Sequence, residues 1–230
     1  MTPDRPTTLQ IDFVSDIACP WCAVGLHALE TALQRLAPEV QARLQFQPFE
    51  LNPQMGAEGE DAAEYLKAKY GLSDGQLAQN RAAIRERGAA VGFNFGERVR
   101  VWNTFDAHRL LHWAAEAGQP VDAQRALKHA LLQAYHGEGR NPADSDVLLD
   151  LAARAGLDVA AAQAVLQSGR YADEVRNAEQ DWLRAGIRSV PAVVVNRQHL
   201  ISGGQPPEVF EQTLRQIAAG AAASAAAGAA

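Results

Sequence analysis

Cysteine is almost absent from this chain, with two residues in 230. Cys19 and Cys22 are separated by only two residues, so a bridge between them would close a very short loop. Such a loop constrains the unfolded chain very little, and no further cysteine is present to add a second bridge. The sequence therefore excludes a disulfide framework as the source of stability.

The chain also lacks an excess of positive charge, long apolar runs and an apolar leader. Its 21 Lys and Arg residues are outnumbered by 27 Asp and Glu residues, a net charge of −6, so nucleic acid is not expected as a partner. Apolar runs such as 190–195 span a few residues, whereas a bilayer requires about 20. The first ten residues carry no hydrophobic segment of a secretory signal. We therefore expect a cytoplasmic protein without a membrane partner.

The first part of the sequence has the pattern of a strand, a helix and a second strand. Residues 10–15 alternate polar and apolar side chains, and residues 43–51 alternate again. Between them, residues 21–36 place apolar side chains at helical spacing after a short loop. The predicted order of this part is therefore β-α-β.

The last part of the chain returns to strands. Residues 192–196 are β-branched and apolar, residues 198–202 can pair with them across a tight turn, and residues 207–219 have helical periodicity. The alanine-rich end, 218–230, predicts a frayed helical extension or a disordered tail. Neither end alone has enough strands for a stable sheet, so we expect both ends to combine into one four-stranded α/β sheet covered by helices.

The middle of the chain is predicted to be helical throughout. Its segments show helical periodicity and no strand alternation, and Ser73 followed by Gln76 has the residue types of a capping box. Because this block interrupts the predicted sheet, we interpret it as an insertion within one fold. The predicted organisation is an α/β domain formed by 1–59 and 187–230, with an all-helical insertion over 60–186.

The tetrapeptide Cys19-Pro20-Trp21-Cys22 is the segment that indicates chemistry. Two thiols at this spacing on the first turn of a helix can form and break a disulfide with little movement of the backbone. Cys19 precedes the unpaired N–H groups of the helix N-terminus, which favour its nucleophilic thiolate form. Cys22 lies one turn inward, where it would resolve a mixed disulfide between Cys19 and a substrate. Pro20 and Trp21, expected to be exposed at the helix tip, are candidates for substrate contact.

A metal site is the competing interpretation of the cysteine pair. A structural zinc site has four ligands, and two of them would have to come from histidines. The six histidines show no pairing that resembles a zinc finger. His108 and His112 have the spacing of a helical metal pair, but the segment lacks the Glu of a zincin helix and a third ligand. We therefore expect no metal.

Four segments in this order carry a resemblance to a known family: DFVSDIACPWC at 12–22, NTFDAHRL at 103–110, EGRN at 138–141 and GIRSVPAVVVN at 186–196. On these segments the chain resembles the DsbA family of thioredoxin-fold oxidoreductases, in particular its cytosolic FrnE-like branch. The resemblance covers nearly the whole chain. It implies a thioredoxin-like domain interrupted by a large helical insertion.

The resemblance also implies further site residues. By resemblance, the Val190–Pro191 peptide bond is cis and faces the thiols, with the preceding backbone able to pair with an incoming peptide or thiol. Asn103, Thr104 and His108 would line the groove over the thiols. The residues alone leave other interpretations open: a trans proline at the start of a strand, a helix cap at Asn103, and a packed or solvated His108.

The leading functional prediction is a cytoplasmic thiol–disulfide oxidoreductase that acts on disulfides or thiols of proteins or small molecules. Cys19 is the nucleophile, Cys22 is the resolving thiol and Pro191 shapes the substrate groove. The dithiol is itself the redox centre, so no external cofactor is expected, and glutathione is a candidate co-substrate. The direction of electron flow and the oligomeric state stay open.

Two other functions share this predicted architecture. The 2-hydroxychromene-2-carboxylate isomerases and kappa-class glutathione transferases use the same inserted fold, but they carry a serine-type site where this chain has Cys19. A non-catalytic peptide-binding or chaperone module would use the groove without turnover. The complete cysteine pair argues against both alternatives.

Overall fold

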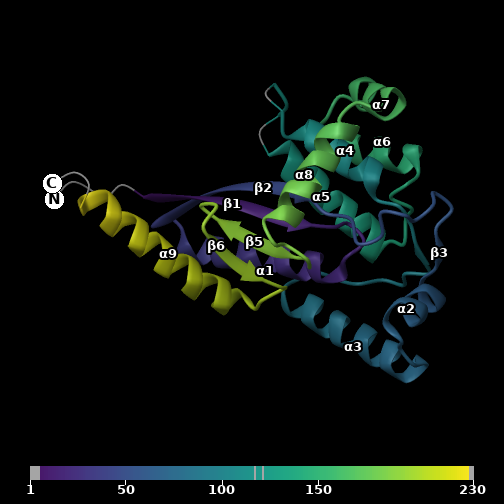
Figure 1. Ribbon diagram of the computed structural model, residues 1–230, viewed down its shortest axis with the longest axis horizontal. Coiled ribbons are helices and arrows are strands. Elements are labelled where there is room, and N and C mark those ends of the chain that lie inside the picture. The colour runs from purple at the N-terminus through teal and green to yellow at the C-terminus, as the bar shows by residue number, and fades with distance from the viewer. Residues whose placement is uncertain (1–5, 117, 121, 228–230) are drawn as a thin grey trace.

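The computed structural model describes residues 6–116, 118–120 and 122–227, which are built around one four-stranded sheet (Figure 1). Its strands are β1 (Thr7–Ser15), β2 (Val40–Pro48), β5 (Ala192–Val195) and β6 (His199–Ser202). They lie in the order β2-β1-β5-β6, with β1 and β2 parallel and the other neighbours antiparallel. The two ends of the chain thus form a single sheet, and the predicted α/β fold is confirmed.

Helices cover both faces of this sheet. α1 (Pro20–Leu36) and α9 (Pro207–Ala227) pack against each other and bury one face, on which Phe13 of β1 is fully enclosed. The opposite face holds a smaller apolar cluster around Val14, against which α8 (Ala172–Arg184) packs. β1 is therefore central and buried on both sides, so the loop that follows it is held firmly at its position.

The segment between β2 and β5 is largely helical. Besides α8 it contains α2 (Ala62–Tyr70), α3 (Asp74–Ala90), α4 (Phe105–Ala114), α5 (Ala123–Leu132), a π-helical turn (Gln133–Gly137), α6 (Ser145–Arg154) and α7 (Val159–Ser168). Helices α4 to α7 share a second apolar core that includes Leu110, Leu127 and Leu151. Helices α2 and α3 lie apart from that core (Figure 1). We call residues 62–90 the α2–α3 arm.

β2 ends earlier than its sequence alternation predicts. The alternation extends over residues 43–51, whereas the paired residues run from Val40 to Pro48. Pro48 is the last of them, and proline has no N–H to donate to a ladder. Beyond it the N–H of Leu51 donates to the Asp16 carboxylate at 2.7 Å. The chain therefore leaves the sheet toward the loop that precedes the cysteines.

The middle segment also contains one pair of short strands. β3 (Glu60–Asp61) and β4 (Arg100–Val101) form an antiparallel ladder, so the prediction that no strand occurs there is wrong. Two residues are too few to show an alternation in the sequence. The predicted capping box is confirmed: the Gln76 N–H donates to Ser73 Oγ at 3.3 Å, and the Ser73 N–H donates to Gln76 Oε1 at 2.9 Å.

The alanine-rich end of the chain is helical as far as Ala227, because α9 continues through it. The last residues of the predicted tail, 228–230, lie outside the described part of the chain. None of the helices in the described residues is both long enough and apolar enough to cross a bilayer.

Candidate active site

The two cysteines lie at the N-terminal end of α1 as free thiols. Cys19 is the N-cap residue, directly before Pro20, and 4% of its surface is exposed. Cys22 lies on the first turn and is fully buried. The Cys22 N–H donates to the Cys19 carbonyl oxygen at 3.1 Å, so the backbone turn between the two thiols is closed. The helix start therefore places the two cysteines on one turn, the spacing at which a disulfide can close with little backbone movement.

The loop before β5 faces Cys19. The Cys19 Sγ–H donates to the Val190 carbonyl oxygen at 3.5 Å, although 171 positions separate the two residues in the sequence. The Val190–Pro191 peptide bond is cis. Pro191 packs against α1, because a Cβ atom at Gly25 would lie only 3.0 Å from Pro191 Cγ. This packing places the Val190 carbonyl oxygen directly beside the Cys19 thiol.

The two thiols differ in acidity. The hydrogen bond with Cys22 lowers the pKa of Cys19, and the Cys22 and Trp21 N–H groups at the helix start add to this effect, which outweighs burial. Burial raises the pKa of Cys22 well above its ordinary value, and the adjacent Cys19 raises it further. Cys19 is therefore the thiol that ionises first, and the thiolate is the nucleophilic form.

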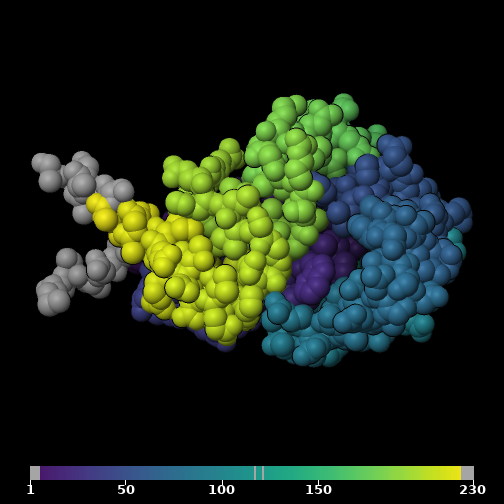
Figure 2. Space-filling view, turned by 60° about the horizontal axis from the view of Figure 1, so that its bottom comes forward, coloured from purple at the N-terminus to yellow at the C-terminus, as the bar shows by residue number. Residues whose placement is uncertain are grey.

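A pocket of about 650 Å³ opens beside Cys19. Cys19, Pro20, Trp21 and Val190 line it on one side, whereas Cys22 does not line it. Trp21 is half-buried rather than exposed as predicted, because it packs against the core beneath α1. The α2–α3 arm supplies apolar side chains to the pocket: Tyr65, Leu66, Tyr70, Leu72, Leu77 and Ile84. Figure 2 shows a hollow between the arm and the C-terminal elements, with the N-terminal part of the chain at its floor.

Positive charge surrounds this pocket although the protein as a whole is acidic. The charged residues that line it are Arg81, Arg85, Arg98, Arg188 and Glu97. Arg98 is held in place, since its Nη1 donates to the Ala18 carbonyl oxygen at 3.0 Å and its guanidinium lies over the Tyr135 ring. Four cations and one anion around a pocket, in a protein of net charge −6, create a local positive potential that favours anionic ligands.

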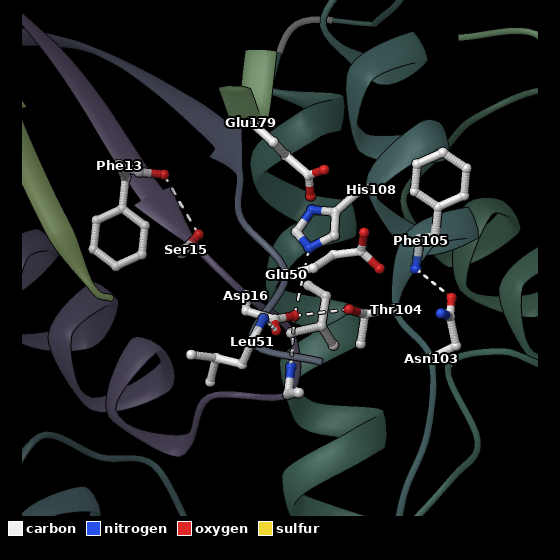
Figure 3. Close-up of polar contacts among 12 residues, drawn as sticks. Phe13, Ser15, Asp16, Glu50, Leu51, Asn103, Thr104, Phe105, His108 and Glu179 are labelled. Atoms are coloured by element: carbon white, nitrogen blue, oxygen red, sulfur yellow. Dashed lines mark hydrogen bonds and ion pairs between the residues drawn. The ribbon is translucent and has the colours of Figure 1, made fainter. Parts of the chain in front are cut away.

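A buried carboxylate, Asp16, organises the loop between β1 and α1 (Figure 3). Its Oδ1 accepts from the Ala18 N–H at 3.0 Å and from the Thr104 hydroxyl at 2.8 Å, and its Oδ2 accepts from the Leu51 N–H at 2.7 Å. His108 Nε2 lies 3.4 Å from Oδ1. Burial acts to raise the pKa of Asp16, but His108 and the backbone donors outweigh burial and lower it. Asp16 thereby ties the loop before the cysteines to the helical insertion.

The three insertion residues that were predicted to line the groove lie behind it. Thr104 and His108 are buried beside Asp16, and neither lines the pocket. Asn103 lies at the start of α4, where its Oδ1 accepts from the Phe105 N–H at 2.8 Å (Figure 3). The prediction of groove contact is therefore corrected. A buried carboxylate requires polar partners, and Thr104 and His108 serve that need instead of facing the pocket.

A second buried carboxylate, Glu179 of α8, lies on the other side of His108 (Figure 3). Burial raises the pKa of Glu179. Arg176, one turn before it, forms ion pairs with Glu179 at 2.9 Å and with Glu50 in the loop after β2. These contacts connect α8 to the same loop whose Leu51 N–H donates to Asp16.

Sequence reasoning missed two buried polar groups near the thiols. Lys128 of α5 is fully buried, and its Nζ has no hydrogen-bond partner among the described residues. His136 is also buried; its Nε2 lies 2.8 Å from the Ile17 carbonyl oxygen, and burial lowers its pKa to about 3. The sequence contains one clue to Lys128, because this residue interrupts the apolar stripe that contains Leu127 and Leu131.

Among the described residues, no three His, Cys, Asp or Glu side chains gather as a metal ion would require. The two histidines with helical metal spacing turn to different partners. His108 faces Asp16, whereas the His112 ring packs against the Tyr171 ring with 5.3 Å between centroids. They do not converge on one point.

The sheet order, the cysteine pair at the start of the first helix and the Val190 carbonyl oxygen facing it are those of a thioredoxin-fold protein with two neighbouring thiols. A family model of the DSBA-like thioredoxin domain matches residues 10–215. The chain therefore belongs to the DSBA-like thioredoxin family, a family of thiol oxidoreductases.

Individual proteins extend this comparison. A probable DsbA oxidoreductase of Streptomyces coelicolor is 37% identical, and its structure matches over 92% of this chain and 90% of its own with a TM-score of 0.83. The uncharacterised protein YwbO of Bacillus subtilis (strain 168) is 27% identical over 212 residues, 90% of this chain and 96% of its own. The cytosolic disulfide reductase DsbM of Pseudomonas aeruginosa, solved with GSH, is 18% identical, covers 90% of this chain and 98% of its own, and has a TM-score of 0.60, which shows the shared fold.

Proposed function

We propose that the protein is a thiol–disulfide oxidoreductase of the FrnE-like branch, with Cys19 as the attacking thiolate and Cys22 as the resolving thiol. The observation that carries the proposal is the asymmetry of the pair. Cys19 lines the pocket and has a lowered pKa, whereas Cys22 is fully buried behind it with a raised pKa. A nucleophile must be accessible and ionised, and a resolving thiol needs only to reach its neighbour.

The proposed exchange has two steps. The Cys19 thiolate attacks one sulfur of a substrate disulfide RSSR, forms a Cys19–SR bond and releases RS⁻. Cys22 then loses its proton, attacks Cys19 Sγ, forms the Cys19–Cys22 disulfide and releases the second substrate thiolate. The Cys22 proton ends on one of the two released thiols, so the products are RSH, RS⁻ and the oxidised protein. The reverse sequence would oxidise two substrate thiols to the disulfide RSSR and reduce the protein.

We propose that the substrate is a low-molecular-weight disulfide with anionic groups. We propose glutathione as the co-substrate. A pocket of about 650 Å³ has the size of a small-molecule site. Arg81, Arg85 and Arg188 are exposed at its rim, where guanidinium groups can pair with carboxylates. The GSH in the structure of the DsbM protein is a parallel in a protein of the same fold.

We further propose that the protein acts in the cytoplasm, without a metal or other external cofactor and without nucleic acid or membrane as a partner. The net charge of −6 supports the absence of a nucleic-acid partner. The similarity to a cytosolic disulfide reductase supports the location. A potential measured in glutathione buffers would establish whether the pair is poised as a reductant in that compartment.

Mass spectrometry after incubation with oxidised glutathione tests the two cysteine roles. We expect Cys22→Ser to accumulate one glutathione on Cys19, because the resolving thiol is missing. Cys19→Ser should capture none at neutral pH, since Cys22 is buried and its pKa is raised. Capture of glutathione by Cys22 in the Cys19→Ser protein would overturn the assignment.

A second set of variants tests the charge of the pocket. Arg85→Gln should slow reduction of oxidised glutathione while leaving reduction of an uncharged disulfide, hydroxyethyl disulfide, unchanged. Arg87→Gln is the matched control, because Arg87 lies on the same helix and is exposed but does not line the pocket. Equal effects of the two variants, or an equal effect on both substrates, would contradict recognition of an anionic substrate.

A further inference from the structure

Lys128 of α5 is a charged side chain that is buried in the interior, next to the buried side of the cysteine pair. It is fully buried, its Nζ has no hydrogen-bond partner among the described residues, and Nζ lies 6.0 Å from the centroid of the Phe46 ring. Burying an ammonium group in an apolar interior costs free energy when no partner is present. A buried ammonium group is therefore usually neutralised or paired with an opposite charge. Neither step of the proposed thiol–disulfide exchange involves Lys128.

Two contacts fix the position of Lys128. One turn before it, Gln124 holds α5 to β2, since its Oε1 accepts from the Phe46 N–H and its Nε2 donates to the Phe46 carbonyl oxygen, both at 3.1 Å. One turn after it, Leu132 packs in the apolar cluster that contains Cys19 and Cys22. The helix therefore presents Lys128 to the interior next to the buried side of the cysteine pair.

The ionisable groups that interact with Lys128 come from three elements. Cys19 and Cys22 belong to the start of α1, Asp16 to the loop before it, and His136 to the π-helical turn. Burial lowers the pKa of Lys128 to about 8, while Cys22, Asp16 and Cys19 act to raise it. His136 stays neutral at physiological pH because its pKa is lowered to about 3. The cysteines are therefore the partners of Lys128 whose charge depends on the redox state of the pair.

We infer that Lys128 is the charge partner of Cys22, and that its ammonium group stabilises the Cys22 thiolate at the moment when Cys22 resolves the mixed disulfide. The inference rests on the proposed thiol–disulfide exchange. Cys22 is buried away from the pocket, so solvent cannot stabilise the negative charge that it must carry before it attacks. A cation already in the interior meets this need without an opening of the core. Lys128 touches no substrate and acts through Cys22.

The redox state of the pair should in turn control the protonation of Lys128. In the reduced protein the thiolate charge favours the ammonium form; in the disulfide form that charge is gone and only Asp16 opposes the cost of burial. Reduction of the disulfide therefore draws a proton onto Lys128, and oxidation releases it. The same linkage requires the reduction potential to depend on pH through Lys128.

Lys128→Met tests the inference, because methionine keeps the length and the helix propensity of lysine without its charge. In the variant, the Cys19–glutathione adduct formed from oxidised glutathione should decay about tenfold more slowly near neutral pH for each unit by which the pKa of Cys22 rises. Its decay rate should also reach a plateau at a more alkaline pH than in the unchanged protein. Leu132→Met is the matched control: it alters the same core one turn along α5, and its pH profile should not move.

Three outcomes would overturn the inference and leave the proposed function standing. One is an unchanged pH profile in folded Lys128→Met, and another is an equal slowing in Lys128→Met and Leu132→Met. A complete lack of exchange in the unchanged protein would overturn the proposed function together with it, so the two failures can be told apart. NMR titration of the Lys128 side chain in the unchanged protein covers the case in which the variant does not fold. We expect a lower midpoint in the oxidised than in the reduced protein, and equal midpoints would be the third refuting result.

Discussion

Replacing Asp16 with asparagine should be among the most damaging conservative changes in this protein. The substitution preserves shape and Oδ1, so the bonds from Ala18 and Thr104 can persist. It replaces Oδ2 with an NH₂ group that faces the Leu51 N–H, which leaves that donor unpaired. Hydrogen bonds to charged groups contribute about 1.5–3 kcal/mol each, and an unsatisfied buried donor costs a similar amount. We therefore expect Asp16→Asn to lower the free energy of unfolding by about 3 kcal/mol.

Urea unfolding followed by tryptophan fluorescence measures this loss, since the chain has four tryptophans. Asp12→Asn is a suitable control. Asp12 is also buried on β1, and its Oδ1 accepts from the Gln47 side-chain amide at 2.6 Å. Asparagine keeps an oxygen that can accept this bond, so Asp12→Asn should cost about 1 kcal/mol. Equal urea midpoints for the two variants would refute the idea that Asp16 anchors the loop.

The effect of Asp16→Asn should depend on pH in one direction. The pKa of Asp16 is lowered in the folded protein, because His108 and the backbone donors outweigh burial. The stability that a lowered carboxylate pKa provides is present above the unfolded-state value of about 3.9 and is lost as the pH falls through the folded value. The difference between the unchanged protein and Asp16→Asn should therefore be full at pH 7 and shrink below about pH 4. A constant difference from pH 7 to pH 3 would show that the charge of Asp16 is not involved.

Two further predictions concern the Cys19 thiol and Gly96, which lines the pocket. The absorbance of the Cys19 thiolate should titrate below the ordinary cysteine value of about 8.5, because Cys22 and the N–H groups at the start of α1 stabilise it; a midpoint at or above that value would contradict this cause. Gly96→Ala should lower the free energy of unfolding by about 1–3 kcal/mol, since its Cβ would lie 2.1 Å from the Gly137 carbonyl oxygen. Gly75→Ala in α3 is the control in urea unfolding, because in the described residues its Cβ would meet no atom within 4 Å beyond its chain neighbours and its own helix backbone, so no loss of stability is expected. An equal loss in both would rule out the close contact as the reason.

Much of the fold follows from patterns that are local in the sequence. Alternation over residues 10–15 and helical spacing over 21–36 predicted β1 and α1 because strand and helix periodicity depend on near neighbours. The two-residue strands β3 and β4 and the end of β2 were not predicted correctly. Their pairing depends on partners elsewhere in the chain, or on a neighbour such as Asp16 that takes over a backbone donor.

The candidate site likewise has features that depend on neighbours in the sequence and features that depend on distant residues. The cysteine pair was evident because both thiols lie in one tetrapeptide, where helix geometry alone brings them together. Asn103, Thr104 and His108 were assigned to the wrong side of the site. Their orientation depends on Asp16, which is 88 residues away from Thr104 in the sequence. The local sequence around a polar residue does not show whether its side chain faces a pocket or a buried charge.

By itself, therefore, the sequence determined the cysteine pair, the helix that carries it and the division of the sheet between the two ends of the chain. Only the tertiary structure decided that arginines from separate segments surround the pocket beside Cys19, and that Lys128 Nζ lies in the interior without a hydrogen-bond partner among the described residues. The physical reason is that acidity and accessibility arise from groups brought together by folding. Burial and charge act through space on Cys19 and Cys22, and neither quantity has a counterpart along the chain.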